Sequence, residues 1–267
     1  MRSTENRSDG WDPAQYGKFA AERGQPFWDL VGLLALDRPI RRAVDLGCGS
    51  GELTAALAAQ LDIAEMVGID SSEKMLTAAE PHASRTVRFQ RGDIGAWTSN
   101  GDQDLVLANA SLQWVPDHVG VLTRWWAGLG SGGQLAVQVP ANADHPSHRV
   151  ATEVAAAEPF RSAMGDAPPP DVVGRNVLLP EQYAILLDHL GAVRQHVRLQ
   201  VYGHKLASSA DVVEWVKGTS LTRFVDVLPD ELHEPFIDEY RCRLLQAIGD
   251  SAPYFYPFRR ILFWGAK

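Results

Sequence analysis

The chain has 267 residues, of which 45% are hydrophobic and 22% charged, and its mean hydropathy is −0.16. This length and composition are typical of a globular protein that buries its own core, and they exclude a disulfide-stapled mini-domain, a disordered chain and a fibrous chain. With 25 basic and 33 acidic residues the net charge is −8, and no basic patch interrupts the acidic balance. Duplex nucleic acid and anionic membranes are therefore not expected partners.

The two cysteines, Cys48 and Cys242, are too few for a disulfide framework, which favours a reducing cytoplasmic location. The polar start of the chain, MRSTENRSDG, has no apolar core of the kind that signal peptides need, and we expect a flexible tail over residues 1–11. No apolar run approaches the roughly 20 residues of a membrane-spanning helix.

In the first half, an Asp12-Pro13 start signal predicts an amphipathic helix that runs to Arg23. Apolar runs of strand length then alternate with helix-period stretches, a pattern typical of a doubly wound, mostly parallel α/β sheet buried on both faces. The predicted strands are Arg42–Leu46, Met66–Asp70, Val87–Gln90, Leu105–Asn109 and Gln134–Val139.

The second half changes character at the proline run Ala167–Pro170, which cannot lie inside a regular helix or strand. A helix ending at Gly191 and an alternating strand over 193–206 follow it, and the mostly helical stretch Asp211–Ile248 is expected to form a cap. The segments that we expect are a tail (1–11), a cofactor-binding α/β core (12–141), an insertion (142–179), a helix and strand that complete the sheet (180–206), a helical cap (207–253) and a last core strand (254–267).

A glycine-rich loop, VDLGCGSG at residues 44–51, follows the first predicted strand and leads into a helix. Glycine lets the backbone approach a ligand where a Cβ would block it, and the start of the helix supplies free N–H donors. The spacing is G-x-G-x-G, not the G-x-G-x-x-G of dinucleotide-binding loops. We therefore expect a nucleotide-type ligand, the alternative being a plain glycine-rich turn.

Acidic residues end the second and third predicted strands. Asp70 comes about 20 residues after the loop, where doubly wound folds place a carboxylate that accepts both ribose hydroxyls; the alternative is an N-cap of the next helix. Asp93 can accept the exocyclic amine of an adenine while the Ile94 N–H meets a ring nitrogen; the alternative is an ordinary turn residue. Because the carboxyl ends of parallel strands share one crevice, these groups predict an adenosine pocket.

Three aspartates, Asp45, Asp70 and Asp93, make this predicted pocket acidic, which would repel a pyrophosphate and suits a cationic ligand. S-adenosylmethionine carries a sulfonium and an ammonium group. The segments VDLGCGSG, GID and GDI also resemble, in this order, binding segments of class I S-adenosylmethionine-dependent methyltransferases. The resemblance implies a Rossmann-like methyltransferase fold and S-adenosylmethionine as the cofactor.

Four further segments are similar to the trans-aconitate 2-methyltransferase family: WDPAQYGKFAAER at 11–23, ANASLQWVPDH at 108–118, LAVQVPAN at 135–142 and VVEWV at 212–216. This similarity implies methyl transfer to a carboxylate of a small di- or tricarboxylic acid such as trans-aconitate, which gives a methyl ester and S-adenosylhomocysteine. The Pro-rich loop at 166–170 departs from the family pattern. This departure bears on the identity of the exact acceptor and not on the cofactor. The cofactor-binding residues expected from the resemblance and the loop are Tyr16, Arg23, Gly47, Cys48, Gly49, Gly51, Asp70, Ser71, Met75, Asp93, Ile94 and Asn109.

A carboxylate acceptor needs no general base, because a group with a pKa of about 4 is already ionised at neutral pH. Transfer then requires alignment and the exclusion of water. His118 can orient the acceptor or cap a helix, and Trp114 can wall the pocket or fill the core. One of two adjacent arginines can supply a cation, since neighbouring strand residues point to opposite faces. The expected acceptor-binding residues are Trp114, His118, Gln138, Tyr202, Trp215, Arg259 and Arg260.

Other functions fit parts of the pattern. A methyltransferase for a malonyl thioester on an acyl carrier protein has a similar core, although an acidic carrier matches a −8 chain poorly. A small-molecule amine or hydroxyl acceptor, a nicotinamide-dependent oxidoreductase and a non-catalytic cofactor-binding module are further alternatives. No metal is expected, because Pro146 between His145 and His148 favours a loop and no third ligand lies nearby.

Overall fold

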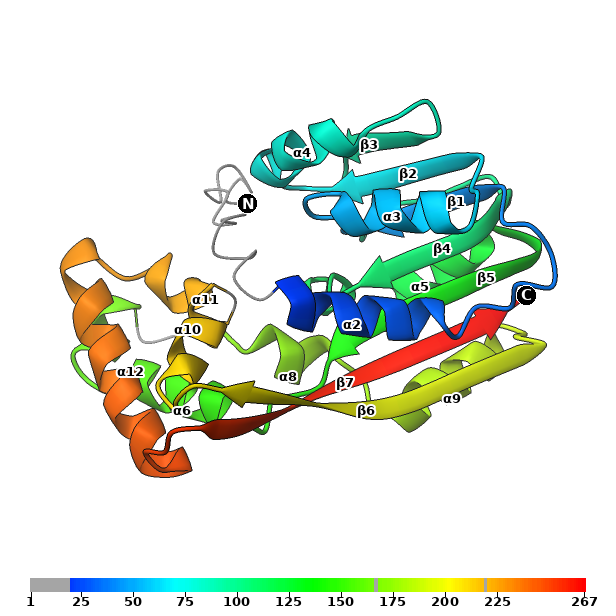
Figure 1. Ribbon diagram of the computed structural model, residues 1–267. Coiled ribbons are helices and arrows are strands. Elements are labelled where there is room, and N and C mark those ends of the chain that lie inside the picture. The colour runs from blue at the N-terminus through cyan, green and yellow to red at the C-terminus, as the bar shows by residue number, and fades with distance from the viewer. Residues whose placement is uncertain (1–19, 166–167, 219) are drawn as a thin grey trace. The chain divides into compact units, whose positions relative to one another are not determined.

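The structure is a computed structural model, and it describes residues 20–165, 168–218 and 220–267 (Figure 1). The chain divides into two compact units. Of the described residues, the sheet unit comprises 20–140, 176–200 and 260–267, and the helical unit comprises 141–165, 168–175, 201–218 and 220–259. The expected tail and Tyr16 lie outside the described residues, as does the side chain of Arg23. The segment boundaries expected from the sequence stay a prediction.

One seven-stranded sheet has the order β3-β2-β1-β4-β5-β7-β6, with β1 to β5 parallel and β7 antiparallel to β5. This arrangement confirms the predicted doubly wound, mostly parallel fold. The order reverses between β1 and β4, which places a crevice at the carboxyl ends of these strands. The strands are β1 Arg42–Leu46, β2 Glu65–Asp70, β3 Val87–Arg91, β4 Gln103–Asn109, β5 Leu129–Pro140, β6 Arg194–Leu206 and β7 Tyr254–Ala266.

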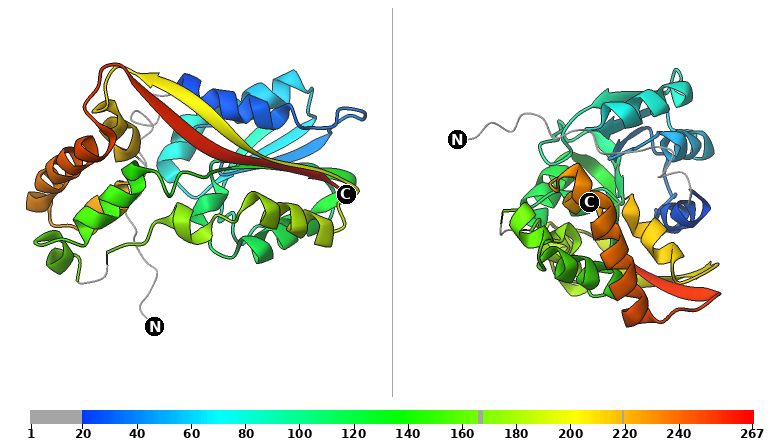
Figure 2. Two further views of the ribbon diagram at one scale, coloured as in Figure 1. Left: turned by 90° about the horizontal axis from the view of Figure 1, so that it is seen from below. Right: turned by 90° about the vertical axis from the view of Figure 1, so that its left-hand side faces the viewer.

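Helices cover both faces of the sheet unit, as its apolar strands require. Helices α2, α3 and α4 lie on one face, and α5 and α9 lie on the other (Figure 2). The central strands between these layers are buried; Leu46, Leu107 and Ala136 are each fully covered. The helices are α2 Ala20–Val31, α3 Glu52–Gln60, α4 Glu73–Ala79, α5 His118–Ala127 and α9 Pro180–His189, with short 3-10 turns at Glu80–His82 and Leu112–Trp114.

Two expectations about helix boundaries are wrong. The leading helix does not end at Arg23 but continues through Pro26 to Val31, because Phe27, Leu30 and Val31 bury an apolar face there. Pro146 does not form a loop between His145 and His148; it occupies the first turn of a helix, a position where its missing N–H costs nothing.

The helical unit contains α6 Pro146–Ala155, α7 Phe160–Ala163, most of α8 Val172–Asn176, α10 Asp211–Lys217, α11 Thr222–Val225, a 3-10 turn Asp230–Leu232 and α12 His233–Ile248. Helix α12 packs along α6, and the Tyr240 hydroxyl donates to the Ser147 carbonyl at 2.9 Å. The ring of Phe236 packs against the rings of both Phe160 and Phe224. These three residues contribute to an apolar core in this unit. No helix among the described residues is long and apolar enough to cross a membrane.

Candidate functional site

The glycine-rich loop begins where β1 ends and crosses to β2. The N–H groups of Gly47 and Cys48 both donate to the Ile69 carbonyl, at 2.7 and 3.1 Å. Gly47 has a φ of 86°, and a Cβ there would lie 2.2 Å from the Ser111 Cβ. Gly47 is therefore required by the protein's own packing, whatever the ligand.

Gly49 differs from Gly47 in what surrounds it. Its φ is 55°, but a Cβ built on it would meet no atom of the described protein within 4 Å. An open glycine in a left-handed conformation marks the point where a ligand can come close to the backbone. The loop thus carries one glycine that the fold needs and one that a ligand would need.

Asp70, at the end of β2, is held by backbone amides on both sides. Its Oδ2 accepts from the Gly49 N–H and its Oδ1 accepts from the Ser72 N–H, both at 2.9 Å. The N-cap of α4 is Ser72, whose hydroxyl accepts from the Met75 N–H, so Asp70 is not the capping residue. These two backbone bonds fix the orientation of the Asp70 carboxylate at the end of β2.

Two other predicted residues lie on the same segment with contrasting exposure. Ser71 is exposed, whereas Met75 is buried at 3% exposure on the inner side of α4. Cys48 is half-buried in the loop, and burial, reinforced by the nearby Asp45 and Asp70, raises the pKa of its thiol. A thiol in this state is a poor nucleophile, so the loop offers shape and backbone polarity rather than covalent chemistry.

Asp45 lies beneath the loop and is 3% exposed. Its Oδ2 accepts from the Thr54 hydroxyl at 2.6 Å. Burial raises the pKa of Asp45 to about 7; the Thr54 hydrogen bond opposes this effect and the charge of Asp70 adds to it. The floor of the loop therefore holds a carboxyl group that is costly to ionise.

The loop after β3 carries Asp93 and Ile94. The Asp93 Oδ1 accepts from the Gly95 N–H at 2.8 Å, and among the described residues no hydrogen bond to its other oxygen is seen. Helix α5 fixes this loop from behind: the indole of Trp125 donates to the Ile94 carbonyl at 3.0 Å, and Arg124 donates to the Gly95 carbonyl at 2.5 Å. A cavity of about 620 Å³ opens beside it, lined by Asp93, Gly95, Ala96, Trp114, Val115, Pro116, Asp117, Val121 and Arg124.

Side-chain amides gather at the carboxyl ends of β4 and β5. Asn109 and Gln138 are partners in the strand register. The Asn109 Oδ1 and the Gln138 Nε2 are both buried and have no hydrogen-bond partner in the described protein. Because buried amide atoms are normally satisfied, this pair of an acceptor and a donor marks a place where a polar ligand would bind.

Trp114 and His118 have different surroundings in the same unit. Trp114 is 37% exposed and lines the cavity beside Asp93. His118 is 2% exposed, and its ring nitrogens lie 2.7 Å from the Tyr183 hydroxyl and 3.0 Å from the Leu112 carbonyl. Burial lowers the pKa of His118, so the ring is neutral with both nitrogens engaged. This geometry favours a structural role for His118 over orienting the acceptor. His118 does not cap α5, however, because the N-cap of that helix is Asp117.

The two adjacent arginines also have different surroundings. Arg260, in the sheet unit, is buried at 6% exposure, and its Nη1 donates to the Gln138 Oε1 at 3.3 Å. Arg259, in the helical unit, is 34% exposed along its side chain and pairs with Asp144. In that unit Tyr202 and Trp215 are buried, and Trp215 packs against the rings of His204, Tyr256 and Phe258.

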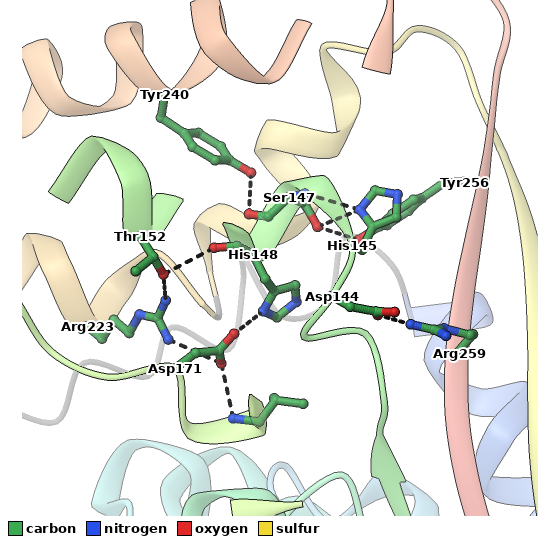
Figure 3. A network of polar contacts seen from close by, with 11 residues as sticks. Asp144, His145, Ser147, His148, Thr152, Asp171, Arg223, Tyr240, Tyr256 and Arg259 are labelled. Atoms are coloured by element: carbon green, nitrogen blue, oxygen red, sulfur yellow. Dashed lines mark hydrogen bonds and ion pairs between the residues drawn. The ribbon is translucent and has the colours of Figure 1, made fainter. Parts of the chain in front are cut away.

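Sequence reasoning missed a polar network in the helical unit, which Figure 3 shows. Asp171 accepts from the His148 Nδ1 at 2.9 Å and pairs with the Arg223 Nη1 at 3.2 Å. The Arg223 Nη2 donates to the Thr152 hydroxyl at 3.3 Å. These residues come from three separate segments of the chain, and none lies in a recognisable motif. The sequence around each residue therefore does not predict the network. The sequence also does not predict the turn over residues 142–145 or the support from Arg124 and Trp125 in α5. It singles out Asn142 only as the end of a family-like segment and His145 only as a rejected metal ligand.

Comparisons with known proteins agree with this geometry. A family model described as a methyltransferase domain matches residues 43–133, which contain the loop, Asp70 and Asp93. The trans-aconitate 2-methyltransferase of Deinococcus radiodurans is 41% identical over 95% of this chain and 96% of its own length. The chain belongs to the trans-aconitate 2-methyltransferase family.

Solved structures show the same fold at low identity. The Bacillus subtilis YcgJ protein superposes with a TM-score of 0.57 at 14% identity, covering 93% of this chain and 98% of its own. Haemonchus contortus phosphoethanolamine N-methyltransferase 2, solved in complex with S-adenosyl-L-methionine, gives a TM-score of 0.54 at 15% identity, with 91% of this chain and 52% of that longer chain covered. These likenesses confirm a Rossmann-like methyltransferase fold for this member of the trans-aconitate 2-methyltransferase family.

Proposed function

We propose that the chain transfers the methyl group of S-adenosylmethionine to a carboxylate of a small di- or tricarboxylic acid such as trans-aconitate, in the cytoplasm. The products are a methyl ester and S-adenosylhomocysteine. The observation that carries the cofactor assignment is Asp70, whose two oxygens are anchored by the N–H groups of Gly49 and Ser72 beside an open glycine. Family membership supports the acceptor class.

The sheet unit has donors and acceptors that suit each part of this cofactor. Asp70 would accept from the ribose hydroxyls, and the Oδ2 of Asp93 would accept from the adenine amine, next to Ile94 and the cavity that Trp114 lines. The Asn109 Oδ1, a buried acceptor to which none of the described residues donates, suits an ammonium group. Tyr16, Arg23, Gly47, Cys48, Gly51, Ser71 and Met75 remain proposed cofactor contacts or neighbours.

When bound, S-adenosylmethionine supplies a methyl group on a positively charged sulfur. The chain's own residues need only hold the two reactants in line and exclude water, because the acceptor carboxylate is already an anion at neutral pH. The engaged, neutral ring of His118 is consistent with a reaction that moves no proton. Proposed acceptor contacts are Trp114, Gln138 and Arg260 in the sheet unit and Tyr202, Trp215 and Arg259 in the helical unit; the engaged ring of His118 favours a structural role for that residue instead.

The test has a binding arm and a turnover arm. In calorimetry, wild-type protein should bind S-adenosylhomocysteine and not NAD, and Asp70→Ala should weaken binding by about 2–3 kcal/mol, the scale of a lost pair of charge-assisted hydrogen bonds. The exposed Asp188 on α9 provides a matched control, since Asp188→Asn should leave binding unchanged.

The turnover arm measures methyl release over a panel of di- and tricarboxylic acids, with a malonyl thioester and small amines as comparisons. Turnover with trans-aconitate and with none of the comparison acceptors supports the proposal. Unchanged cofactor affinity in Asp70→Ala would contradict the pocket assignment, and turnover restricted to the thioester or the amines would contradict the acceptor class.

A further inference from the structure

A tight turn joins β5 to α6 in the helical unit. The Asn142 carbonyl accepts from the His145 N–H at 2.9 Å, so residues 142–145 form a β-turn with Asp144 at its third position. The turn is fastened to β7 by two further bonds: the Ala141 N–H donates to the Arg259 carbonyl, and the Arg259 N–H donates to the Asn142 Oδ1, each at 2.9 Å. One strand residue and one turn are thereby held in fixed register.

A cavity of about 280 Å³ lies against this turn and is lined by Asn142, Asp144, His145, Pro146, Val201, Pro257 and Arg259. Its polar lining comes from the turn and from Arg259. The rest of the wall is proline and valine, which offer no hydrogen-bond donors through their side chains.

Asn142 contributes an amide donor to this site without an acceptor. Its side chain is fully buried, and its Nδ2 has no hydrogen-bond partner among the described residues. The orientation of the amide is determined, because only the oxygen can accept from the Arg259 N–H. Buried amide nitrogens are seldom left unsatisfied, so this one calls for an acceptor that the described chain does not supply.

His145 contributes a second donor. Its Nδ1 accepts from the Ser147 N–H at 3.1 Å (Figure 3). Burial, with the charges of His148 and Arg149, lowers the pKa of His145 to about 4, so the ring is neutral at pH 7. A neutral imidazole that accepts at Nδ1 carries its hydrogen on Nε2. The ring therefore presents a donor and no charge.

Arg259 contributes the cation, and its present partner is easily replaced. Its guanidinium pairs with the carboxylate of Asp144, as Figure 3 shows, and the two side chains are 34% and 71% exposed. Exposed ion pairs contribute little to stability, and Asp144 sits on a turn from which its side chain can swing into solvent. A ligand carboxylate can thus take the place of the Asp144 carboxylate at low cost.

We propose that Asn142, His145 and Arg259 form a subsite for a carboxylate group of the acceptor, and that Asp144 is an internal competitor for it. The inference rests on the proposed function and names the part of the chain that recognises the acid. Two neutral donors and one planar cation match a carboxylate, and the guanidinium fork can bind both of its oxygens. The Asp144 carboxylate already shows the chemistry of the ligand that would displace it.

The competing explanation is that the ion pair of Arg259 and Asp144 only holds the turn against β7. The two explanations predict different changes in KM for Asp144→Asn. If Asp144 competes with the acceptor, Asp144→Asn should lower KM for trans-aconitate about threefold, and Arg259→Gln should raise it about tenfold or more, with kcat nearly unchanged. An ion pair that only holds the turn would give a lower melting temperature and an unchanged or higher KM in both variants. Arg241→Gln and Asp238→Asn break a comparable exposed ion pair on α12 and serve as matched controls.

Two further variants keep the test decisive if Arg259→Gln folds poorly. Arg259→Lys retains the charge but not the fork and should still raise KM. Asn142→Asp keeps the acceptor for the Arg259 N–H, replaces the Nδ2 donor by an oxygen, and should also raise KM. In the double variant of Asp144 and Arg259, the benefit of Asp144→Asn should disappear, because there is then no cation to compete for.

Binding without turnover separates this inference from the proposed function. Calorimetric titration of trans-aconitate into the S-adenosylhomocysteine complex measures the subsite directly. If wild-type protein binds trans-aconitate but does not methylate it, while the variants change its Kd in the stated directions, the subsite stands and the proposed function falls. If wild-type protein methylates trans-aconitate but Asp144→Asn fails to tighten it and Arg259→Lys fails to weaken it, the subsite is wrong and the function stands.

Discussion

Each compact unit holds an aspartate that is largely shielded from solvent, buried in the case of Asp45 and 18% exposed along the side chain in the case of Asp171, and the two have opposite surroundings. Asp45 in the sheet unit is 3% exposed and shares a hydrogen bond with the neutral hydroxyl of Thr54. Asp171 in the helical unit meets His148 and the guanidinium of Arg223, whose side chain is 10% exposed. Burial raises the pKa of Asp45 to about 7. Burial would also raise the pKa of Asp171, but the hydrogen bond from His148 and the charges of His148 and Arg223 lower it below its usual value.

This difference shows how each unit accommodates charge. A carboxyl group that is costly to ionise lies under a loop for which we propose a cationic ligand, so the incoming charge would meet a site able to become negative. The helical unit instead balances its charges internally, and its carboxylate is ionised throughout the neutral range. The two units should therefore respond to pH in opposite directions.

The largest expected effect is the pH dependence of the Asp45 contribution. Its folded pKa lies above the unfolded value near 3.8, so the unfolded chain releases the proton first and stability falls as pH rises from 4 to 7. The isosteric Asp45→Asn does not titrate, so its free energy of unfolding relative to wild type should rise by about 4 kcal/mol over this range and level off above pH 7.

Hydrogen exchange of β1 and α3 measures this local stability. The exposed Asp188→Asn variant should show no such pH-dependent difference from wild type. A difference between Asp45→Asn and wild type that stays flat from pH 4 to pH 8 would show that Asp45 is ionised in the folded protein, and the contrast with Asp171 would be lost.

The Asp171→Asn variant tests the other half of the comparison. It should lower the stability of the helical unit by about 3 kcal/mol at pH 7, because the buried Arg223 would lose its counter-charge. In wild type this contribution is present above the unfolded pKa of the carboxyl group and is lost as pH falls through the lower folded value. Faster hydrogen exchange in α6 and α11 reports the loss.

Asp238→Asn, on the exposed surface of α12, is the matched control and should leave the exchange rates in α6 and α11 nearly unchanged. Equal exchange rates in wild type and Asp171→Asn would mean that Arg223 is adequately solvated without its carboxylate, and the helical unit would then not depend on internal charge balance.

The positions of the candidate site residues in the sheet unit could be predicted from the sequence because these residues lie in short motifs at strand ends; their role in binding stays a prediction. β1 has the predicted bounds, Asp70 is the last residue of β2, and Asp93 lies two residues after the end of β3, as the carboxyl-end rule requires. The start of β5 could not be predicted: it begins at Leu129, five residues before the expected Gln134, across three glycines that carry no strand propensity.

The polar groups of the helical unit could not be predicted in the same way. Asp144 and Arg259 are 115 residues apart, and Asp171 is 52 residues from Arg223, so only the folded chain brings them together. The sequence predicted that one of Arg259 and Arg260 binds the acceptor, only because neighbouring residues of a strand point to opposite faces. It could not indicate which of the two does so. The roles of Asn142 and His145 required the turn, its hydrogen bonds and the unsatisfied amide.

A pair of loop variants tests the proposal that the ligand comes close to the backbone of the glycine-rich loop at Gly49. Gly49→Ala should cost little stability beyond the strain of its left-handed conformation, yet weaken S-adenosylhomocysteine by about 2 kcal/mol, because the added Cβ fills the space left for a ligand. Gly47→Ala should instead destabilise the protein, since its Cβ would collide with Ser111. Melting temperature and calorimetry separate the two, and normal affinity in a folded Gly49→Ala protein would move the ligand away from this loop.

The smallest effect concerns how α5 supports the Asp93 loop. Trp125 is fully buried and donates to the Ile94 carbonyl, so Trp125→Phe removes one hydrogen bond behind a loop that we propose contacts adenine. Trp126→Phe is the control, because it removes a similar volume from the same helix without touching that carbonyl. Both variants should melt earlier than wild type, but only Trp125→Phe should weaken S-adenosylhomocysteine, by about 1 kcal/mol, the net contribution of a typical hydrogen bond. Equal affinities in the two variants would show that the loop keeps its conformation through Arg124 and Asp93 alone, and that α5 contributes packing to the sheet unit but no positioning of the ligand.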